Sequence, residues 1–171
     1  IRTGERLFVN GRNGCGKSSL LHAVLAHTAG ETWQPAGGGG ELGTLETASG
    51  LTVSYAGQDT SFLRGKITDF CRERRLDESL FCAILRQLDV ERAQFSKPME
   101  DFSEGQKKKV LLAASLLTPA HLYIWDEPLN YIDVFSRMQI EKLLLEAGPT
   151  MLVVEHDGKF REKTATGVIN L

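Results

Sequence analysis

The stretch Gly11-Arg-Asn-Gly-Cys-Gly-Lys17-Ser18 decides the fold that this sequence predicts. A short apolar segment, residues 6–10, precedes it, and residues 17–29 follow with apolar side chains at helical spacing. In such a loop, glycines allow backbone N–H groups to curl around a phosphate, and the helix N-terminus adds a partial positive charge. The pattern G-x-x-x-x-G-K-[ST] between a strand and a helix therefore predicts a phosphate-binding loop.

Each polar position of this loop has an expected role toward a bound nucleotide. Lys17 would reach the β- and γ-phosphate oxygens of ATP, and the Ser18 hydroxyl would bind Mg²⁺. Cys15 occupies a variable position of the pattern. A glycine-rich turn that only starts a helix is the less favoured alternative, because the flanking strand and helix both fit. The residues expected to contact the nucleotide here are Asn13, Gly14, Cys15, Gly16, Lys17, Ser18 and Ser19.

A second part of the site is predicted where the apolar segment His121-Leu-Tyr-Ile-Trp-Asp126-Glu127 ends in two carboxylates. Beside the strand of the phosphate loop, Asp126 would accept hydrogen bonds from the water shell of Mg²⁺. Glu127 points the other way and would polarise a water for in-line attack on the γ-phosphate. Two acids after a strand can also cap a turn, but the phosphate loop in the same chain favours the catalytic interpretation.

The segment Phe102-Ser103-Glu-Gly-Gln106 opens a helix that we expect to run from about residue 104 to residue 117. Ser103 and Gln106 form a capping box, which is a purely structural reason for both residues. The functional alternative is a second phosphate-binding helix N-terminus, at which Gly105 permits close backbone approach. Residues 107–109 are lysines in the first turns, where the helix dipole disfavours cations. Either an anion docks there or the lysines form a solvated face, and the two interpretations are equally weighted.

Two single polar residues complete the predicted site. Gln58 follows an expected strand at residues 51–56, and His156 follows another at residues 150–155. Both strands should end at the edge of the sheet that carries the phosphate loop, where ligands of parallel sheets bind. A lone Gln or His after a strand is otherwise usually a surface residue.

The order of the expected elements predicts an α/β fold. Two near-continuous apolar strands, residues 122–125 and 150–154, indicate a mostly parallel sheet buried on both faces. Residues 44–46 and 51–56 predict two strands joined at residues 48–50, which would form a small antiparallel β portion. Residues 66–117 predict an inserted helical subdomain, within which Asp77 would cap a helix.

The bulk composition is that of a soluble globular domain. The chain has 171 residues, of which 42% are hydrophobic and 25% charged, and its formal net charge of −2 argues against a broad nucleic-acid-binding surface. The longest apolar run, residues 110–117, is too short to cross a bilayer, so we expect no direct membrane insertion. Three unpaired cysteines fit a reducing, cytoplasmic compartment. Residues 31–41, with four consecutive glycines, predict a flexible surface loop.

These elements resemble the motifs of ABC ATPases in their order along the chain. Residues 11–18 resemble the Walker A motif, Gln58 the Q-loop and residues 102–106 the signature. Residues 126–128 resemble the Walker B motif, Asp133 the D-loop and His156 the switch histidine. The resemblance runs from about Gly4 to the C-terminus, so we expect a single ABC ATPase domain over residues 1–171. It implies that two ABC domains meet head to tail, with Ser103, Gly105 and Gln106 contacting ATP held by the partner domain. It further implies that Glu127 promotes hydrolysis and that residues 129–133 lie across the interface.

The same resemblance implies roles for the two single polar residues. His156 would contact the γ-phosphate and help to orient the attacking water, while Gln58 would sense Mg²⁺ together with Ser18 and Asp126. The family usually stacks adenine on an aromatic residue well upstream of the phosphate loop. Only ten residues precede Gly11, so we expect the chain to be truncated near its N-terminus.

The D-loop favours one branch of the family. Asn130 stands where transporter subunits more often carry serine, and Asp-Glu-Pro-Leu-Asn-Tyr-Ile-Asp133 resembles the ABC-F branch. The chain is most similar to the second ABC domain of bacterial ABC-F proteins that protect ribosomes from antibiotics, which implies the ribosome as a partner. The alternatives are a nucleotide-binding subunit of a membrane transporter, a non-catalytic ATP-dependent clamp and, less favoured still, a recombination ATPase of the same superfamily.

Overall fold

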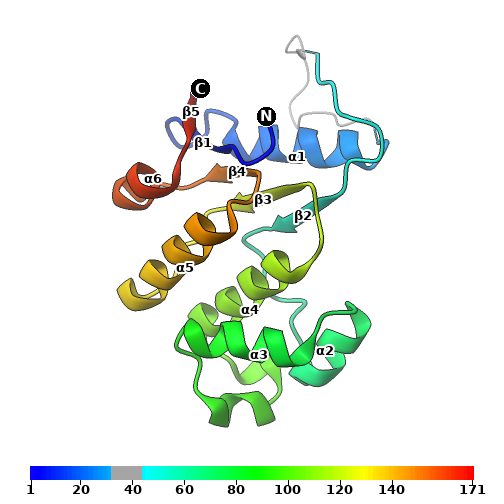
Figure 1. Cartoon of the computed structure of the whole chain (residues 1–171), viewed down its shortest axis with the longest axis vertical. Coiled ribbons are helices and arrows are strands. Elements are labelled where there is room, and N and C mark those ends of the chain that lie inside the picture. Colours follow the sequence, from blue (N-terminus) through cyan, green and yellow to red (C-terminus); the bar gives the residue numbers. More distant parts are fainter. Residues whose placement is uncertain (32–43) are drawn as a thin grey trace.

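The computed structural model describes residues 1–31 and 44–171, and its centre is a parallel β-sheet (Figure 1). In the described residues the strand order is β2-β3-β4-β1-β5, and each pair of neighbouring strands is parallel. The predicted mostly parallel α/β fold is therefore confirmed. The strands are β1 (Arg6–Asn10), β2 (Val53–Ala56), β3 (Leu122–Asp126), β4 (Met151–Val154) and β5 (Gly167–Asn170).

Helices cover both faces of this sheet, with α1 on one face and α4, α5 and α6 on the other (Figure 1). Side chains alternate across a strand, so β4 sends Leu152 to the α1 face and Val153 to the opposite face. This arrangement explains why the central strands are apolar at nearly every position. The helices are α1 (Lys17–Thr28), α2 (Ile67–Glu73), α3 (Glu78–Gln87), α4 (Glu104–Leu117), α5 (Val134–Ala147) and α6 (Gly158–Thr164).

The helical segment between β2 and β3 packs onto the sheet through one continuous core. Phe70 of α2 and Phe81 of α3 have ring centroids 6.0 Å apart, and both belong to the same buried cluster as Trp125 of β3. Two short 3₁₀ turns, Arg92–Ser96 and Met99–Asp101, lead into α4. The predicted cap of α3 is confirmed, since the Asp77 carboxylate accepts a hydrogen bond from the backbone N–H of Leu80.

The predicted antiparallel β portion is not found in the part of the chain that the structure describes. Residues 44–46 form no strand, and the Leu51 N–H donates to the Ala48 carbonyl in a turn. Residues 53–56 pair instead with β3 in parallel. The prediction was wrong because pairing with the buried strand β3 outweighs a local hairpin. Most of the predicted surface loop at residues 31–41 lies outside the described residues.

Asp133 joins α5 to α4 at the end of the segment that follows β3. Its carboxylate accepts from the Ser136 N–H at 2.8 Å and lies 2.8 Å from the Lys109 ammonium. Burial opposes its ionisation, but hydrogen bonds from Lys109 and Ser136 outweigh that effect and lower the pKa of Asp133 below its ordinary value. The carboxylate is therefore both a helix cap and one half of an ion pair.

We expect Asp133→Asn to lower the midpoint of thermal unfolding at neutral pH, because asparagine cannot pair with Lys109. Because the pKa of Asp133 is lower in the folded state than in the unfolded chain, its ionised carboxylate stabilises the fold at any pH above the unfolded pKa. This stabilisation is lost as the pH falls through the pKa of Asp133 in the folded state. The difference between the two proteins should therefore narrow from about pH 5 downwards. Asp69→Asn, at an exposed pair with Arg72, is the control. A difference that is constant with pH would contradict this assignment.

Candidate active site

The phosphate loop connects β1 to α1 at the carboxyl end of β1. Gly16 is the residue before α1 and has φ of +102°, a conformation that glycine adopts without the strain a side chain would add. The Lys17 side chain is 7% exposed and its ammonium donates to the carbonyls of Gly11 at 2.9 Å and Arg12 at 3.0 Å. The ammonium is thus held against the loop, where a phosphate group would meet it.

A hollow of about 300 Å³ lies over this loop, and Glu127 of a different loop forms part of its wall. The tertiary structure therefore brings the predicted catalytic carboxylate to the predicted phosphate site. Cys15, which we expected to contact the nucleotide, is exposed and does not line the hollow. The lining residues are Asn13, Gly14, Gly16, Lys17, Ser18, Ser19 and Glu127.

The two carboxylates at the end of β3 have different surroundings. Asp126 is 4% exposed, and among the residues that the structure describes its Oδ1 is buried without a hydrogen-bond partner. An oxygen in this state fits a metal-bound water as its missing donor, so the site fits Mg²⁺. Glu127 has φ of +49°, which is uncommon outside glycine and costs backbone strain. Of the two neighbouring carboxylates, only Glu127 lines the hollow over the phosphate loop.

Two side chains from different loops contact the Glu127 carboxylate. The Asn130 amide donates to Oε2 at 2.7 Å, and His156 Nε2 lies 3.5 Å from Oε1. Asn130 follows in the same loop, whereas His156 follows β4, the strand that pairs with β3. The structure thus places His156 beside Glu127, where it can orient the carboxylate or a water that the carboxylate binds.

Gln58 does not line the hollow of the phosphate loop. It lies instead in a separate hollow of about 130 Å³ between β2, α4 and the loop that follows β3. This second hollow is lined by Gln58, Thr60, Glu104, Lys108, Asn130 and Tyr131. The structure therefore places Gln58 next to the signature helix and the D-loop rather than in the wall of the phosphate pocket.

The N-terminus of α4 has the predicted capping box. Ser103 Oγ accepts from the Gln106 N–H, and the Gln106 side chain accepts from the Ser103 N–H. Gly105 has a packing reason as well, since a Cβ there would lie 2.5 Å from the carbonyl oxygen of Tyr131. None of these three residues lines the hollow over the chain's own phosphate loop.

The lysines of α4 differ from both interpretations made for residues 107–109. Lys108 is 3% exposed and donates to the carbonyl of Gly57 at 2.9 Å and, more weakly, to that of Asp126 at 3.4 Å. Lys109 pairs with Asp133, and Lys107 with Glu104. Lys108 is buried because α4 lies against the sheet, whereas Lys107 pairs within α4 with an exposed glutamate. The missed signal was that residue 108 shares a helix face with residues 111, 112 and 115.

The buried ammonium of Lys108 contributes positive charge beneath the carboxylates. Desolvation lowers the pKa of Lys108, while the nearby charges of Asp126, Glu155 and Glu127 oppose that shift. Lys108 also connects α4 to two loops of the candidate site. One of its acceptors, the Gly57 carbonyl, directly precedes Gln58. The other, the Asp126 carbonyl, directly precedes Glu127. Sequence reasoning missed this residue and also Glu155, which ends the apolar run of β4.

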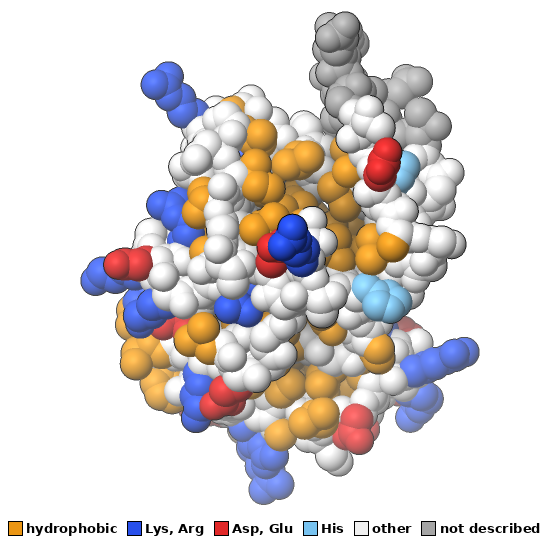
Figure 2. Space-filling view, turned by 45° about the horizontal axis from the view of Figure 1, so that its top comes forward, with side chains coloured by type: hydrophobic (Ala, Val, Ile, Leu, Met, Phe, Trp, Pro, Cys, Tyr) orange, Lys and Arg blue, Asp and Glu red, His pale blue; other side chains and the backbone are white. Residues whose placement is uncertain are grey.

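A mostly apolar hollow of about 440 Å³ lies at the other end of the strands. Its lining includes His121 before β3, Thr150 before β4 and Leu51 before β2. Figure 2 shows hydrophobic side chains over much of one face, with charged side chains of both signs among and around them. Because phosphates bind at the carboxyl ends of such strands, this hollow is separate from the candidate active site.

A parallel sheet with a phosphate loop after its strand β1 and paired carboxylates after β3 defines a P-loop nucleotide-binding protein. A family model described as ABC transporter matches residues 1–130. This chain belongs to that family and is an ABC ATPase domain, which binds and hydrolyses ATP. None of the helices in the described part of the chain combines the length and apolar character needed to span a bilayer.

Individual relatives support the resemblance to the ABC-F branch. The ribosome protection protein VmlR of Bacillus subtilis (strain 168) is 30% identical over 170 residues, which cover 96% of this chain and 28% of that protein. The ATP-binding protein Uup of Caulobacter vibrioides is 30% identical over 180 residues, which cover 100% of this chain and 28% of that protein. The chain thus spans less than a third of the length of these relatives.

Solved structures share the fold. The archaeal ribosome recycling factor aABCE1, solved with the ribosomal stalk protein aP1, matches with a TM-score of 0.76 and 25% identity over 99% of this chain and 32% of that one. The ATP-binding cassette MJ0796, in a dimeric structure bound to ADP and Pi, matches with a TM-score of 0.72 at 18% identity over 100% of this chain and 82% of that one.

We expect Lys17→Ala, made in the complete protein, to raise the Kd for ATP by about 10-fold to 100-fold. A charge-assisted hydrogen bond is worth about 1.5–3 kcal/mol, which corresponds to that range. Titration with a fluorescent ATP analogue measures the change. Lys142→Ala, which removes an exposed ammonium paired with Glu146 on α5, is the control and should bind like the parent. Unchanged affinity of the Lys17 variant would refute the phosphate-loop assignment.

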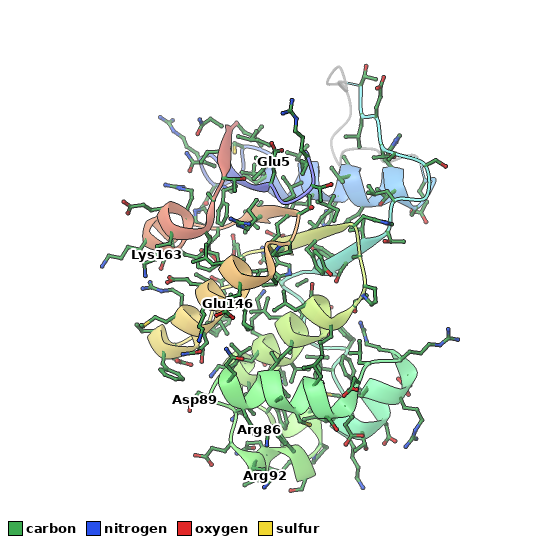
Figure 3. The ribbon with its side chains drawn as sticks, in the orientation of Figure 1. Glu5, Arg86, Asp89, Arg92, Glu146 and Lys163 are labelled. Atoms are coloured by element: carbon green, nitrogen blue, oxygen red, sulfur yellow. The ribbon has the colours of Figure 1, made fainter. Side chains whose placement is uncertain are left out.

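We expect Glu127→Gln to leave ATP binding intact and to slow hydrolysis by about 10²- to 10⁴-fold, the usual contribution of a general base. Glutamine keeps the size of the side chain but cannot accept a proton from water. The rate of phosphate release at saturating ATP measures the effect. Glu146→Gln, at a position labelled in Figure 3, is an exposed control on α5. A Glu127 variant within a few-fold of the parent would remove this residue from the role of base.

Proposed function

We propose that this chain is the ATPase domain of an ABC-F protein that acts on the ribosome, and that a second ABC domain completes its active site. The observation that carries the ribosomal part is the similarity of 96% of this chain to a protein named for ribosome protection. Asn130, the residue that first favoured the ABC-F branch, hydrogen-bonds the Glu127 carboxylate and so has a place in the proposed chemistry.

In the proposed mechanism, the phosphate loop binds and orients ATP. Backbone N–H groups at residues 13–19 and the Lys17 ammonium hold the phosphates, while the N-terminus of α1 adds its partial charge. Ser18 and Asp126 are suited to hold Mg²⁺, and Gln58, which lines a separate hollow, is its proposed sensor. When bound, Mg²⁺ neutralises the charge that develops on the phosphate oxygens.

Hydrolysis then requires a water aligned with the γ-phosphate. Glu127, in the wall of the phosphate hollow, is the proposed acceptor of the water's proton. Asn130 and His156 contact its two oxygens and would hold the carboxylate in the attacking orientation. Glu127 and Asn130 follow β3 and His156 follows β4, so the paired strands bring the starts of the two loops together.

The second ABC domain enters because the signature residues do not serve this chain's own pocket. Ser103, which is exposed, and the half-buried Gly105 and Gln106 lie at the N-terminus of α4, outside the hollow that Lys17 lines. In a head-to-tail pair, that N-terminus would bind the γ-phosphate of ATP held by the partner domain. ATP would then join the two domains, and hydrolysis at Glu127 would release them.

The proposed role of the complete protein is protection of the ribosome from antibiotics, in the cytoplasm. Such a role uses ATP binding to stabilise the ribosome-bound state and hydrolysis to end it. A transporter subunit would use the same chemistry to move a membrane partner. The location of the ATP-bound protein therefore separates the two.

We expect the complete protein carrying Glu127→Gln to sediment with ribosomes in the presence of ATP and to remain in the supernatant without it. The variant holds ATP but hydrolyses it slowly, so the bound state accumulates. Lys17→Ala is the control, because weak ATP binding should abolish the ATP-dependent sedimentation. Recovery of the variant with membranes rather than ribosomes would reject the ribosomal role and favour a transporter subunit.

A further inference from the structure

Glu155 is a buried carboxylate at the end of β4, between the strand and His156. It is 7% exposed, and burying a carboxylate is costly unless hydrogen bonds or charges compensate it. The buried Lys108 ammonium supplies nearby positive charge. Position 155 continues a strand of four buried apolar residues, where an acidic side chain has no reason to occur for packing alone.

The two oxygens of Glu155 bind backbone groups of two different loops. Oε1 accepts from the N–H of His156 at 2.6 Å and from that of Asp157 at 3.0 Å. Oε2 accepts from the N–H of Leu129 at 3.0 Å. One carboxylate thus connects the loop after β4 to the loop after β3, and all three bonds are charge-assisted.

These two loops carry the residues whose spacing matters for the proposed chemistry. Leu129 lies two residues after Glu127 and one before Asn130, while His156 is the next residue after Glu155. The His156 and Glu127 side chains are 3.5 Å apart between Nε2 and Oε1. The sheet holds the start of both loops, since Asp126 pairs with Val154, but it does not hold their continuation.

A second set of contacts holds the far side of the loop after β4. Asp157 caps α6 through the Phe160 N–H, and its other oxygen pairs with Arg137 of α5 at 2.7 Å. Lys163 of α6, labelled in Figure 3, pairs with Glu141 of α5 at 2.8 Å. The loop is therefore attached to α5 and α6 on one side, and Glu155 supplies its attachment to the Glu127 loop.

We infer that Glu155 is a positioning residue, which sets the distance and orientation of His156 relative to Glu127 by binding the backbones of both loops. The inference rests on the roles proposed for Glu127 and His156. Glu155 does not contact the reacting atoms. It acts on the rate of hydrolysis, because a misplacement of about 1 Å in a catalytic group costs up to about 100-fold.

The test is Glu155→Gln in the complete protein. Glutamine has the same shape but only one acceptor oxygen, so it loses the bond to one of the two loops. We expect kcat for ATP hydrolysis to fall by about 10-fold to 100-fold, with KM and the Kd for ATP within about twofold of the parent. Glu155→Asp, whose carboxylate is one methylene shorter, should show the same selective loss of kcat and is the second variant if the first does not fold.

Ser115→Ala is the control for a general loss of stability. Its buried hydroxyl bonds Ser54 of β2 and the Trp125 indole N–H of β3, neither of which belongs to either loop. A Ser115 variant with an equal loss of melting temperature should keep its kcat. An equal loss of kcat in the control, or an unchanged kcat in both Glu155 variants, would overturn the inference.

The double variant Glu155→Gln with His156→Ala tests the route of the effect. If Glu155 acts through His156, the double variant should hydrolyse ATP within about threefold of His156→Ala alone. If the loss of kcat in the double variant equalled the product of the losses in the two single variants, Glu155 would not act through His156. Glu127→Gln is measured in parallel, because its retention of a normal rate would refute the proposed chemistry itself. A slow Glu127 variant beside normal Glu155 variants would refute only the positioning role.

Discussion

The pairing of β3 with β4 is the interaction on which the candidate active site depends. Its parallel register opposes Asp126 to Val154, and one further hydrogen bond, from the Glu127 N–H to the Val154 carbonyl at 2.8 Å, ends the ladder. The backbone segments that follow β3 and β4 therefore leave the sheet side by side. A carboxylate and an imidazole that are 29 positions apart in the sequence are thereby brought to the same place. A shift of the register by one residue would turn every side chain to the opposite face.

Beyond the ends of β3 and β4, two buried charged side chains make the hydrogen bonds that connect the loops to the rest of the chain. Lys108 places an ammonium beneath the end of β3, and Glu155 places a carboxylate between the two loops. Both are nearly inaccessible to water, so their energy depends on keeping every partner. In the proposed chemistry, the hydrogen bonds of Glu155 would hold the loops after β3 and β4 at a defined distance from each other.

Local patterns predicted the elements well and their partners less well. The strand before the phosphate loop, the helix after it and the capping box at Ser103 all follow from residues within a few positions of one another. The prediction of a strand at residues 44–46 was wrong. That strand would have needed β2 as its partner, and β2 pairs with β3 instead. The lysines after Ser103 were interpreted as surface or anion-binding residues, because their place in the first turns of a helix can be recognised from the sequence. The sequence does not show that the carbonyls of Gly57 and Asp126 lie within reach of Lys108.

The sequence by itself determined the class of chemistry, because the phosphate loop is contiguous and the order of the remaining motifs is specific to one family. It also determined which residues at the ends of strands would matter, since the carboxyl edge of a parallel sheet is a known meeting point. Only the tertiary structure decided which of them meet, with Glu127 beside His156 and Gln58 in a separate hollow. Register, the positive φ of Glu127 and the contacts of buried side chains arise from long-range packing, which no local pattern in the sequence encodes.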